Sequence, residues 1–155
     1  MGNALYDQNK REEAADFYKK ALVEDPNLSD VHYNLGNTLY QLKKTDEAIS
    51  HYAKAIELNP TKSESYYNLG NACCVIDKFD DAIENYKKAI ELDSYNAPAF
   101  YNLGNAYYML GQYDRSINSY NMALTLNDDS AECYFNLASA YKDKGDLVEA
   151  IKRFK

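Results

Sequence analysis

Asparagine and tyrosine side chains recur along the chain at a step of 34 residues, and these rows are best suited to hydrogen-bond chemistry. The asparagine rows are Asn34, Asn68, Asn102 and Asn136, and Asn3, Asn37, Asn71 and Asn105. The aromatic-rich rows are Tyr33, Tyr67, Tyr101 and Phe135, and Tyr6, Tyr40, Cys74 and Tyr108. A carboxamide donates and accepts hydrogen bonds together, and a tyrosine ring supplies rigid contact area. The rows therefore predict recognition of an extended peptide backbone.

The predicted peptide-binding residues come from these rows. They are Tyr33, Asn34, Asn37, Tyr40, Tyr67, Asn68, Asn71, Tyr101, Asn102, Asn105, Tyr108 and Asn136. The alternative is that these asparagines hydrogen-bond only to a neighbouring helix or to water. One position of the 34-residue period carries a lysine three times, at Lys10, Lys44 and Lys78. These lysines form either a solvated rim of the groove or a strip that binds acidic groups.

Other side chains offer little for catalysis or metal binding. His32 and His51 fall on different predicted helices, and the chain has no paired carboxylates at a useful spacing and no glycine-rich phosphate loop. Cys73 falls in a buried stripe, while Cys74 faces the groove side as at most a reactive thiol. We expect Cys73, Cys74 and Cys133 to be reduced thiols, and we predict no enzymatic activity, no cofactor and no metal.

Composition excludes several classes of partner. The formal net charge is -7 and the estimated pI is about 4.8, which disfavours nucleic acid and anionic membrane surfaces. No stretch approaches the roughly 20 apolar residues of a membrane span, and the opening residues contain no apolar leader. These features predict a soluble cytoplasmic protein.

The elements that position the rows are two helices in each 34-residue period. The string Tyr-Asn-Leu-Gly-Asn occurs at residues 33–37, 67–71 and 101–105, and helical apolar spacing appears twice per period. Acidic residues open each second helix, and prolines at 26 and 60 follow two of them. Small residues recur where two helices must approach closely, at Gly36, Gly70, Gly104 and Ala138. An aromatic stripe is expected to be buried on the second helices, at Tyr18, Tyr52, Tyr86, Tyr120 and Phe154.

This pattern of period, Leu-Gly pair, small residues, aromatics and proline resembles the tetratricopeptide repeat family over the whole chain. The resemblance implies an all-α, right-handed superhelix (solenoid) of helical hairpins, with the first helices lining a concave groove. One departure is that the usual tryptophan of the first helix is replaced by His32, Tyr66, Phe100 or Tyr134, with His32 expected to fit most loosely. The lysine and arginine residues with which some chaperone adaptors of this family clamp a terminal carboxylate are absent.

The phase of the repeat predicts a single array over residues 1–155. It comprises a partial repeat at 1–28, full repeats at 29–62, 63–96 and 97–130, and a partial repeat at 131–155. The leading hypothesis is a scaffolding module that binds a peptide segment of a partner protein. Two alternatives remain: the substrate-selecting repeats of a larger enzyme, as in O-linked N-acetylglucosamine transferases, or a homo-oligomer formed through exposed terminal helices.

Overall fold

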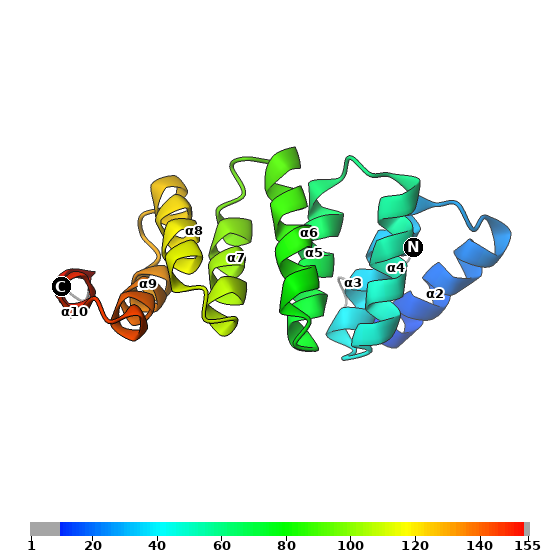
Figure 1. Cartoon of the computed structure of the whole chain (residues 1–155). Helices are drawn as coiled ribbons and strands as arrows, with labels where there is room; N and C mark the ends of the chain where they lie inside the picture. Colours follow the sequence, from blue (N-terminus) through cyan, green and yellow to red (C-terminus); the bar gives the residue numbers. More distant parts are fainter. Residues whose placement is uncertain (1–9, 154–155) are drawn as a thin grey trace. The chain divides into compact units, whose positions relative to one another are not determined.

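The computed structural model describes residues 10–153, and every regular element within that range is a helix (Figure 1). In chain order these are α2 (Arg11–Glu24), α3 (Ser29–Gln41), α4 (Thr45–Leu58), α5 (Ser63–Val75), α6 (Phe79–Leu92), α7 (Ala97–Met109), α8 (Tyr113–Leu126), α9 (Ala131–Lys144) and α10 (Leu147–Arg153). The first helices α3, α5, α7 and α9 begin at the predicted repeat starts, residues 29, 63, 97 and 131. The predicted fold class of tandem helical hairpins is confirmed.

The chain divides into two compact units, Met1–Asp77 and Lys78–Lys155. Helices α2 to α5 belong to the first unit and helices α6 to α10 to the second. The division falls in the turn between α5 and α6, inside the predicted repeat at 63–96, and the single array over 1–155 stays a prediction. The predicted row members Asn3 and Tyr6, and Phe154 of the aromatic stripe, lie outside the described residues.

The helix ends follow the signals expected from the sequence. Acidic residues occupy the first turns of α2, α4, α6 and α8, where carboxylates face the unsatisfied backbone amides. Pro26 and Pro60 follow the ends of α2 and α4 by two residues. A proline at these places cannot continue the helix, so α2 and α4 end before it.

The turn after each first helix uses a left-handed residue at the same repeat position. Gly111 and Gly145 have φ of 69° and 97°, as their residue type predicts. Lys43 and Asp77 take the same conformation with φ of 61° and 58°, although both carry a Cβ. The hairpin geometry therefore imposes this backbone conformation even where the sequence supplies no glycine.

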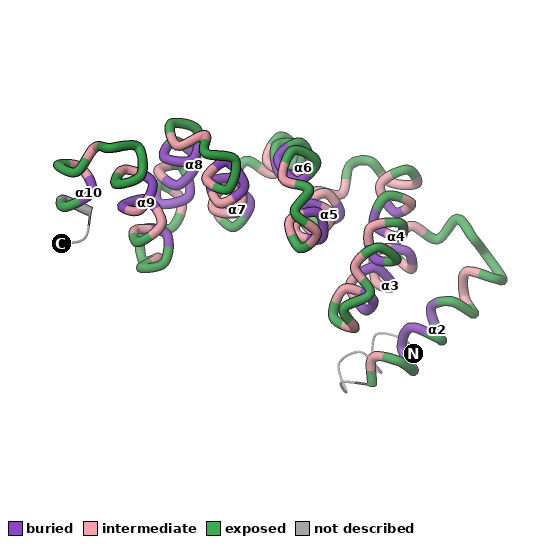
Figure 2. The backbone as a smooth tube through the Cα atoms, turned by 60° about the horizontal axis from the view of Figure 1, so that its bottom comes forward, coloured by how far each residue is buried: buried purple, intermediate pink, exposed green. Residues whose placement is uncertain are grey.

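The helices of a hairpin approach closely where a glycine faces a buried tyrosine. A Cβ on Gly36 would lie 2.7 Å from the Tyr52 ring, and one on Gly104 would lie 2.6 Å from the Tyr120 ring. Tyr52 and Tyr120 are each only 1% exposed, and buried stretches alternate with exposed ones along each helix (Figure 2). The predicted close contacts and the buried aromatic stripe of the second helices are confirmed at these positions.

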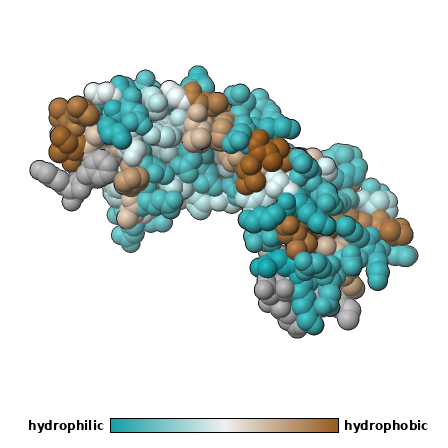
Figure 3. Space-filling model, turned by 90° about the horizontal axis from the view of Figure 1, so that it is seen from below, coloured by the Kyte–Doolittle hydropathy of each residue, from teal (hydrophilic) through white to brown (hydrophobic). Residues whose placement is uncertain are grey.

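The last helix leaves an apolar face uncovered. Leu147, Val148 and Ile151 of α10 are 60%, 66% and 60% exposed, and Figure 3 shows hydrophobic surface at this end of the second unit. Ile117, which occupies the position of Ile151 one repeat earlier, is buried under α9 in the core of the second unit.

Candidate peptide-binding site

In the second unit, two asparagines and two tyrosines join three helices by hydrogen bonds. The Oδ1 atom of Asn105 on α7 accepts from the hydroxyl of Tyr120 on α8 at 2.7 Å and from Nδ2 of Asn136 on α9 at 3.1 Å. The same Nδ2 of Asn136 donates to the hydroxyl of Tyr101 at 2.8 Å. The network therefore connects the α7–α8 hairpin to the first helix of the next one.

The first unit repeats this network at equivalent positions. Oδ1 of Asn37 on α3 accepts from the Tyr52 hydroxyl at 2.8 Å and from Nδ2 of Asn68 on α5 at 2.9 Å. Nδ2 of Asn68 also donates to the Tyr33 hydroxyl at 3.1 Å. Because the same contacts form in both units, the hydrogen-bonded ladder is a property of the repeat and not of one site.

The ladder changes what the asparagines can offer a ligand. A carboxamide nitrogen carries two hydrogens, and both hydrogens of Asn68 and of Asn136 have acceptors within the protein. For these two residues the structure supports the alternative role, a bond to the neighbouring helix. Among the residues that the structure describes, Nδ2 of Asn37 makes no hydrogen bond, so this amide keeps donors for a ligand. The Asn105 amide instead faces the Tyr101 hydroxyl and favours its ionised form, which partly offsets the rise in the pKa of that phenol.

The twelve predicted residues all lie on first helices and are all half-buried. Tyr33, Asn34, Asn37 and Tyr40 are on α3; Tyr67, Asn68 and Asn71 are on α5; Tyr101, Asn102, Asn105 and Tyr108 are on α7; and Asn136 is on α9. The structure brings Tyr33, Asn37 and Asn68 together in the first unit, and Tyr101, Asn105 and Asn136 in the second. Their role in peptide binding stays a prediction.

A pocket of about 420 Å³ opens over the ladder of the second unit. Its walls come from α7, α8 and α9, and its lining residues are Tyr101, Asn105, Tyr108, Met109, Tyr120, Glu132, Phe135, Asn136 and Ser139. Four of these are predicted site residues. Because the ladder forms part of its wall, the polar groups of the pocket are held in place before any ligand arrives.

Sequence reasoning missed three contributors to this pocket, Met109, Glu132 and Ser139, and left Phe135 out of the site. Met109 and Phe135 are 61% and 59% exposed and both line this one pocket. Two of these residues could have been found from the sequence, because Phe135 continues the row of Tyr101 and Ser139 continues the row of Asn105. The pocket therefore adds apolar side chains to the polar rows.

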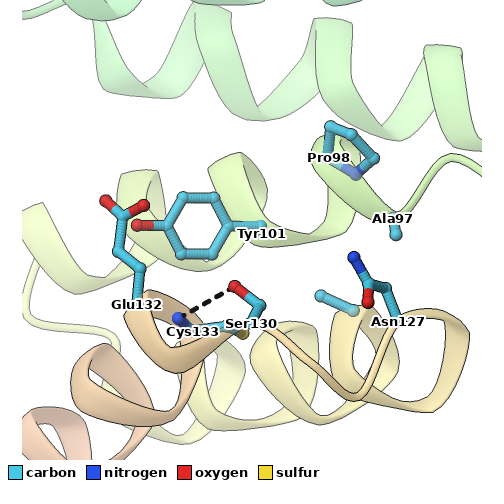
Figure 4. A pocket seen from close by; sticks show the side chains of 8 residues that line it. Ala97, Pro98, Tyr101, Asn127, Ser130, Glu132 and Cys133 are labelled. Carbon is cyan, nitrogen blue, oxygen red and sulfur yellow. Dashed lines mark hydrogen bonds between the residues drawn. The ribbon is translucent and has the colours of Figure 1, made fainter.

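Two tyrosine hydroxyls beside carboxylates define the electrostatics of the pocket. Burial, together with a hydrogen bond to Glu132, raises the pKa of Tyr101 to about 12. A hydrogen bond to the Asp143 carboxylate, assisted by burial, raises the pKa of Tyr108 to about 12. Both phenols are therefore neutral at physiological pH, and the Glu132 carboxylate lies beside the Tyr101 hydroxyl (Figure 4).

The Tyr101–Glu132 pair also borders a second, smaller pocket. This pocket of about 170 Å³ lies against the start of α7 and the α8–α9 turn and is lined by Pro98, Asn127, Ser130 and Cys133 among others (Figure 4). Burial is the main cause that raises the pKa of the Cys133 thiol to about 11. The thiol thus stays protonated at neutral pH and is a poor nucleophile.

The first unit carries a cation at the corresponding edge. Nζ of Lys62 lies 2.7 Å from the Asp30 carboxylate and 4.1 Å from the centroid of the Tyr33 ring. The recurring lysines Lys10, Lys44 and Lys78 instead immediately precede α2, α4 and α6 and are exposed, as expected of a solvated rim. Lys62 was not singled out from the sequence because it does not recur at the 34-residue step.

The two histidines form a pair that sequence reasoning did not anticipate. Their Nδ1 atoms are 2.9 Å apart, and Nε2 of His32 is 3.0 Å from the carbonyl oxygen of Pro26. His32 is 8% exposed and more buried than its counterparts Tyr66, Phe100 and Tyr134. The expectation that His32 fits most loosely is wrong, because its two ring nitrogens have hydrogen-bond partners that a tryptophan ring could not use in the same way.

The structure also bears on metal binding, membrane spans and the state of the cysteines. Within residues 10–153, no group of three or more histidine, cysteine, aspartate or glutamate side chains is placed to hold a metal ion. None of the described helices has the length and apolar character needed to cross a membrane. Cys73 and Cys133 are buried and Cys74 is half-buried, and all three are free thiols.

Comparisons with known proteins cover nearly the whole chain. A family model described as TPR repeat matches residues 2–43, 76–111 and 104–145, and two models described as tetratricopeptide repeat match residues 29–62 and 51–84. A comparison with curated protein sequences gave no match.

Solved structures with the same fold include several of MamA. A crystal structure of MamA is 32% identical, with coverage of 99% of this chain and 90% of that chain and a TM-score of 0.97. MamA from Desulfovibrio magneticus RS-1 is 22% identical, with coverage of 99% and 86% and a TM-score of 0.94. YrrB, described as a TPR protein with an unusual peptide-binding site, is 22% identical, with coverage of 98% and 78% and a TM-score of 0.90. These matches confirm the solenoid of helical hairpins.

Proposed function

The chain belongs to the tetratricopeptide repeat family, and we propose that it is a protein-interaction module that binds a peptide segment of a partner on the faces of its first helices. The observation that carries this proposal is the pocket between α7 and α9, where exposed Phe135 and Met109 adjoin the carboxamide of Asn105. Apolar side chains anchor a segment by leaving water, and a fixed amide orients its backbone. The peptide-binding site named in the YrrB description gives the same fold a precedent for this role.

The contacts of these residues support a division of roles within the proposed site. Asn136 and Asn68 hold neighbouring helices together, so we assign them a supporting role in the wall of the groove. Phe135 and Met109 have the apolar area that a ligand can cover. Covering one aromatic side chain of this size contributes roughly 1.5–3 kcal/mol, which is about tenfold to a hundredfold in affinity.

The proposal is tested by selecting peptides from a random displayed library on the full chain and measuring their affinities by fluorescence anisotropy. Phe135→Ser should weaken a selected peptide at least tenfold. Met122→Ser, which changes an apolar residue that is 48% exposed on the second helix α8, should leave affinity within about twofold and serves as the matched control. Equal weakening by both substitutions, or failure of the library to yield any binder, would refute the proposed site.

Self-association is a second candidate role, and one observation favours it. Val148 is exposed at a repeat position where the preceding second helices carry Asp46, Asp80 and Asp114. An apolar residue in place of an acid extends the uncovered face of α10 and suits it to a second protein surface. Val148→Asp should lower the concentration-dependent mass measured by light scattering, and a mass that is independent of both concentration and this substitution would exclude the role.

A further inference from the structure

The pocket lined by α7, α8 and α9 has a carboxylate but no basic side chain. Its lining contains one ionised group at neutral pH, the Glu132 carboxylate, and no lysine or arginine. Tyr101 and Tyr108 add no charge because the pKa of each is raised to about 12. The lining therefore presents one carboxylate among apolar and neutral polar groups, while the Asp143 carboxylate next to it bonds to the Tyr108 hydroxyl and lies 3.6 Å from Nζ of Lys142.

The first unit has a lysine beside the tyrosine that corresponds to Tyr101. At the equivalent edge, Lys62 forms an ion pair with Asp30 and lies over the Tyr33 ring. A step of 68 residues places Ser130 at the position of Lys62 and Pro98 at the position of Asp30. The second unit therefore has no lysine beside Tyr101, and the described side chains form no ion pair with Glu132.

The walls of the pocket suit the stem of a long side chain. Phe135 and Met109 supply exposed apolar surface, and the rings of Tyr101 and Tyr108 supply aromatic surface next to it. Lysine and arginine carry three or four methylene groups beneath a cationic head, so their stems cover apolar surface while the head seeks a carboxylate or a ring face. A volume of about 420 Å³ leaves room for one such side chain and the backbone that carries it.

We infer that this pocket binds a lysine or arginine side chain of the docked segment, with Glu132 as its charge partner and Phe135 and Met109 against its stem. This inference rests on the proposed peptide-binding function and names its ligand class. The partner segment is therefore basic at this position, and an acidic segment is repelled. The cation of the segment would lie beside the Tyr101 ring, as Lys62 lies over the Tyr33 ring in the first unit.

The test uses three small probes, the N-acetyl amides of arginine, citrulline and glutamate. Citrulline keeps the shape of arginine without its charge. Binding to the full chain is followed by NMR, through the side-chain amides of Asn105 and Asn136 and the backbone amide of Glu132. We expect the arginine probe to bind roughly fivefold more tightly than citrulline, the glutamate probe to bind least, and added salt to reduce the difference.

Two matched variants separate the charge effect from a change in folding. In the Glu132→Gln variant, the arginine and citrulline probes should bind with equal affinity. Glu64→Gln alters the equivalent first-turn acid of α5 and should leave the arginine preference unchanged. Equal binding of the two probes to the wild-type chain, a preference that survives Glu132→Gln, or shifts outside the pocket would overturn the inference.

The inference about Glu132 can fail while the proposed peptide-binding function stands, and the experiments distinguish the two cases. Library peptides that depend on Phe135 but show no preference for basic residues would leave the proposed function standing and remove the role of Glu132. An absence of any shift with the arginine probe at its highest soluble concentration counts against the inference in the same way.

Discussion

Replacing Asn136 with alanine should destabilise the chain, because its amide nitrogen joins α9 to α7. The substitution removes hydrogen bonds to the Tyr101 hydroxyl at 2.8 Å and to Oδ1 of Asn105 at 3.1 Å. Each such bond contributes about 0.5–1.5 kcal/mol net. Alanine regains roughly 0.6 kcal/mol of helix propensity, so the expected loss in the free energy of unfolding is about 1.5 kcal/mol.

The control for this change is Asn118→Ala on α8. Asn118 is exposed, and its side chain makes no hydrogen bond within the described part of the chain, so this substitution changes propensity alone. Urea unfolding followed by circular dichroism should separate the two variants by about 2 kcal/mol at equal m-values. If Asn136→Ala proved as stable as Asn118→Ala, the ladder would not hold the helices together, and Asn136 would be free for a ligand.

Three further substitutions test the packing, the turns and the histidine pair. Gly104→Ala places a Cβ 2.6 Å from the Tyr120 ring and should cost about 1–2 kcal/mol despite its better helix propensity; a more stable variant in urea unfolding would contradict the close contact. Lys43→Gly should stabilise the chain by about 0.5–1 kcal/mol, since φ at this position is 61°, and a lower melting temperature would argue against backbone strain there. The pKa of His51 is lowered by burial and by His32, so the unfolded chain binds more protons below about pH 6.5 and stability should fall as the pH drops through that value. Unfolding midpoints against pH should show this fall in the wild-type chain and a weaker one in His51→Gln.

The helices could be predicted from the sequence because their signals are local. The repeated glycine and tyrosine positions already indicated close contacts within hairpins, and Gly36 against Tyr52 confirms them. The acidic first turns and the two prolines placed the helix ends to within a few residues. These features depend on residues near one another in the chain, so one period of sequence contains the information for one hairpin.

The hydrogen-bond partners could not be predicted in the same way. Whether Asn68 faces a ligand or bonds to Asn37 depends on the distance between two first helices, which the spacing of residues does not contain. The pairing of His32 with His51 depends likewise on how α3 and α4 cross. The left-handed turn at Lys43 escaped notice because its residue type gives no sign of that conformation.

The candidate site was predicted in its polar part and missed in its apolar part. The row of Tyr101 and the row of Asn105 both enter the pocket, as expected. Met109 was overlooked because a repeat-based search favours residue types that recur, whereas Phe135 was recognised as the last member of the row of Tyr101 but left out of the predicted site. Residues that depart from the repeat are therefore where the specificity of this chain is expected.

A spin-labelled ligand gives the most direct test that the first-helix face receives a partner segment. A peptide selected on the full chain would carry a nitroxide label, and paramagnetic broadening of backbone amide signals would be measured across the protein. Broadening should be strongest at Asn105, Phe135 and Ser139 and weak at Met122 on α8. Broadening centred on Met122, with the signals of α7 and α9 unchanged, would place the segment on the second helices and contradict the proposed site.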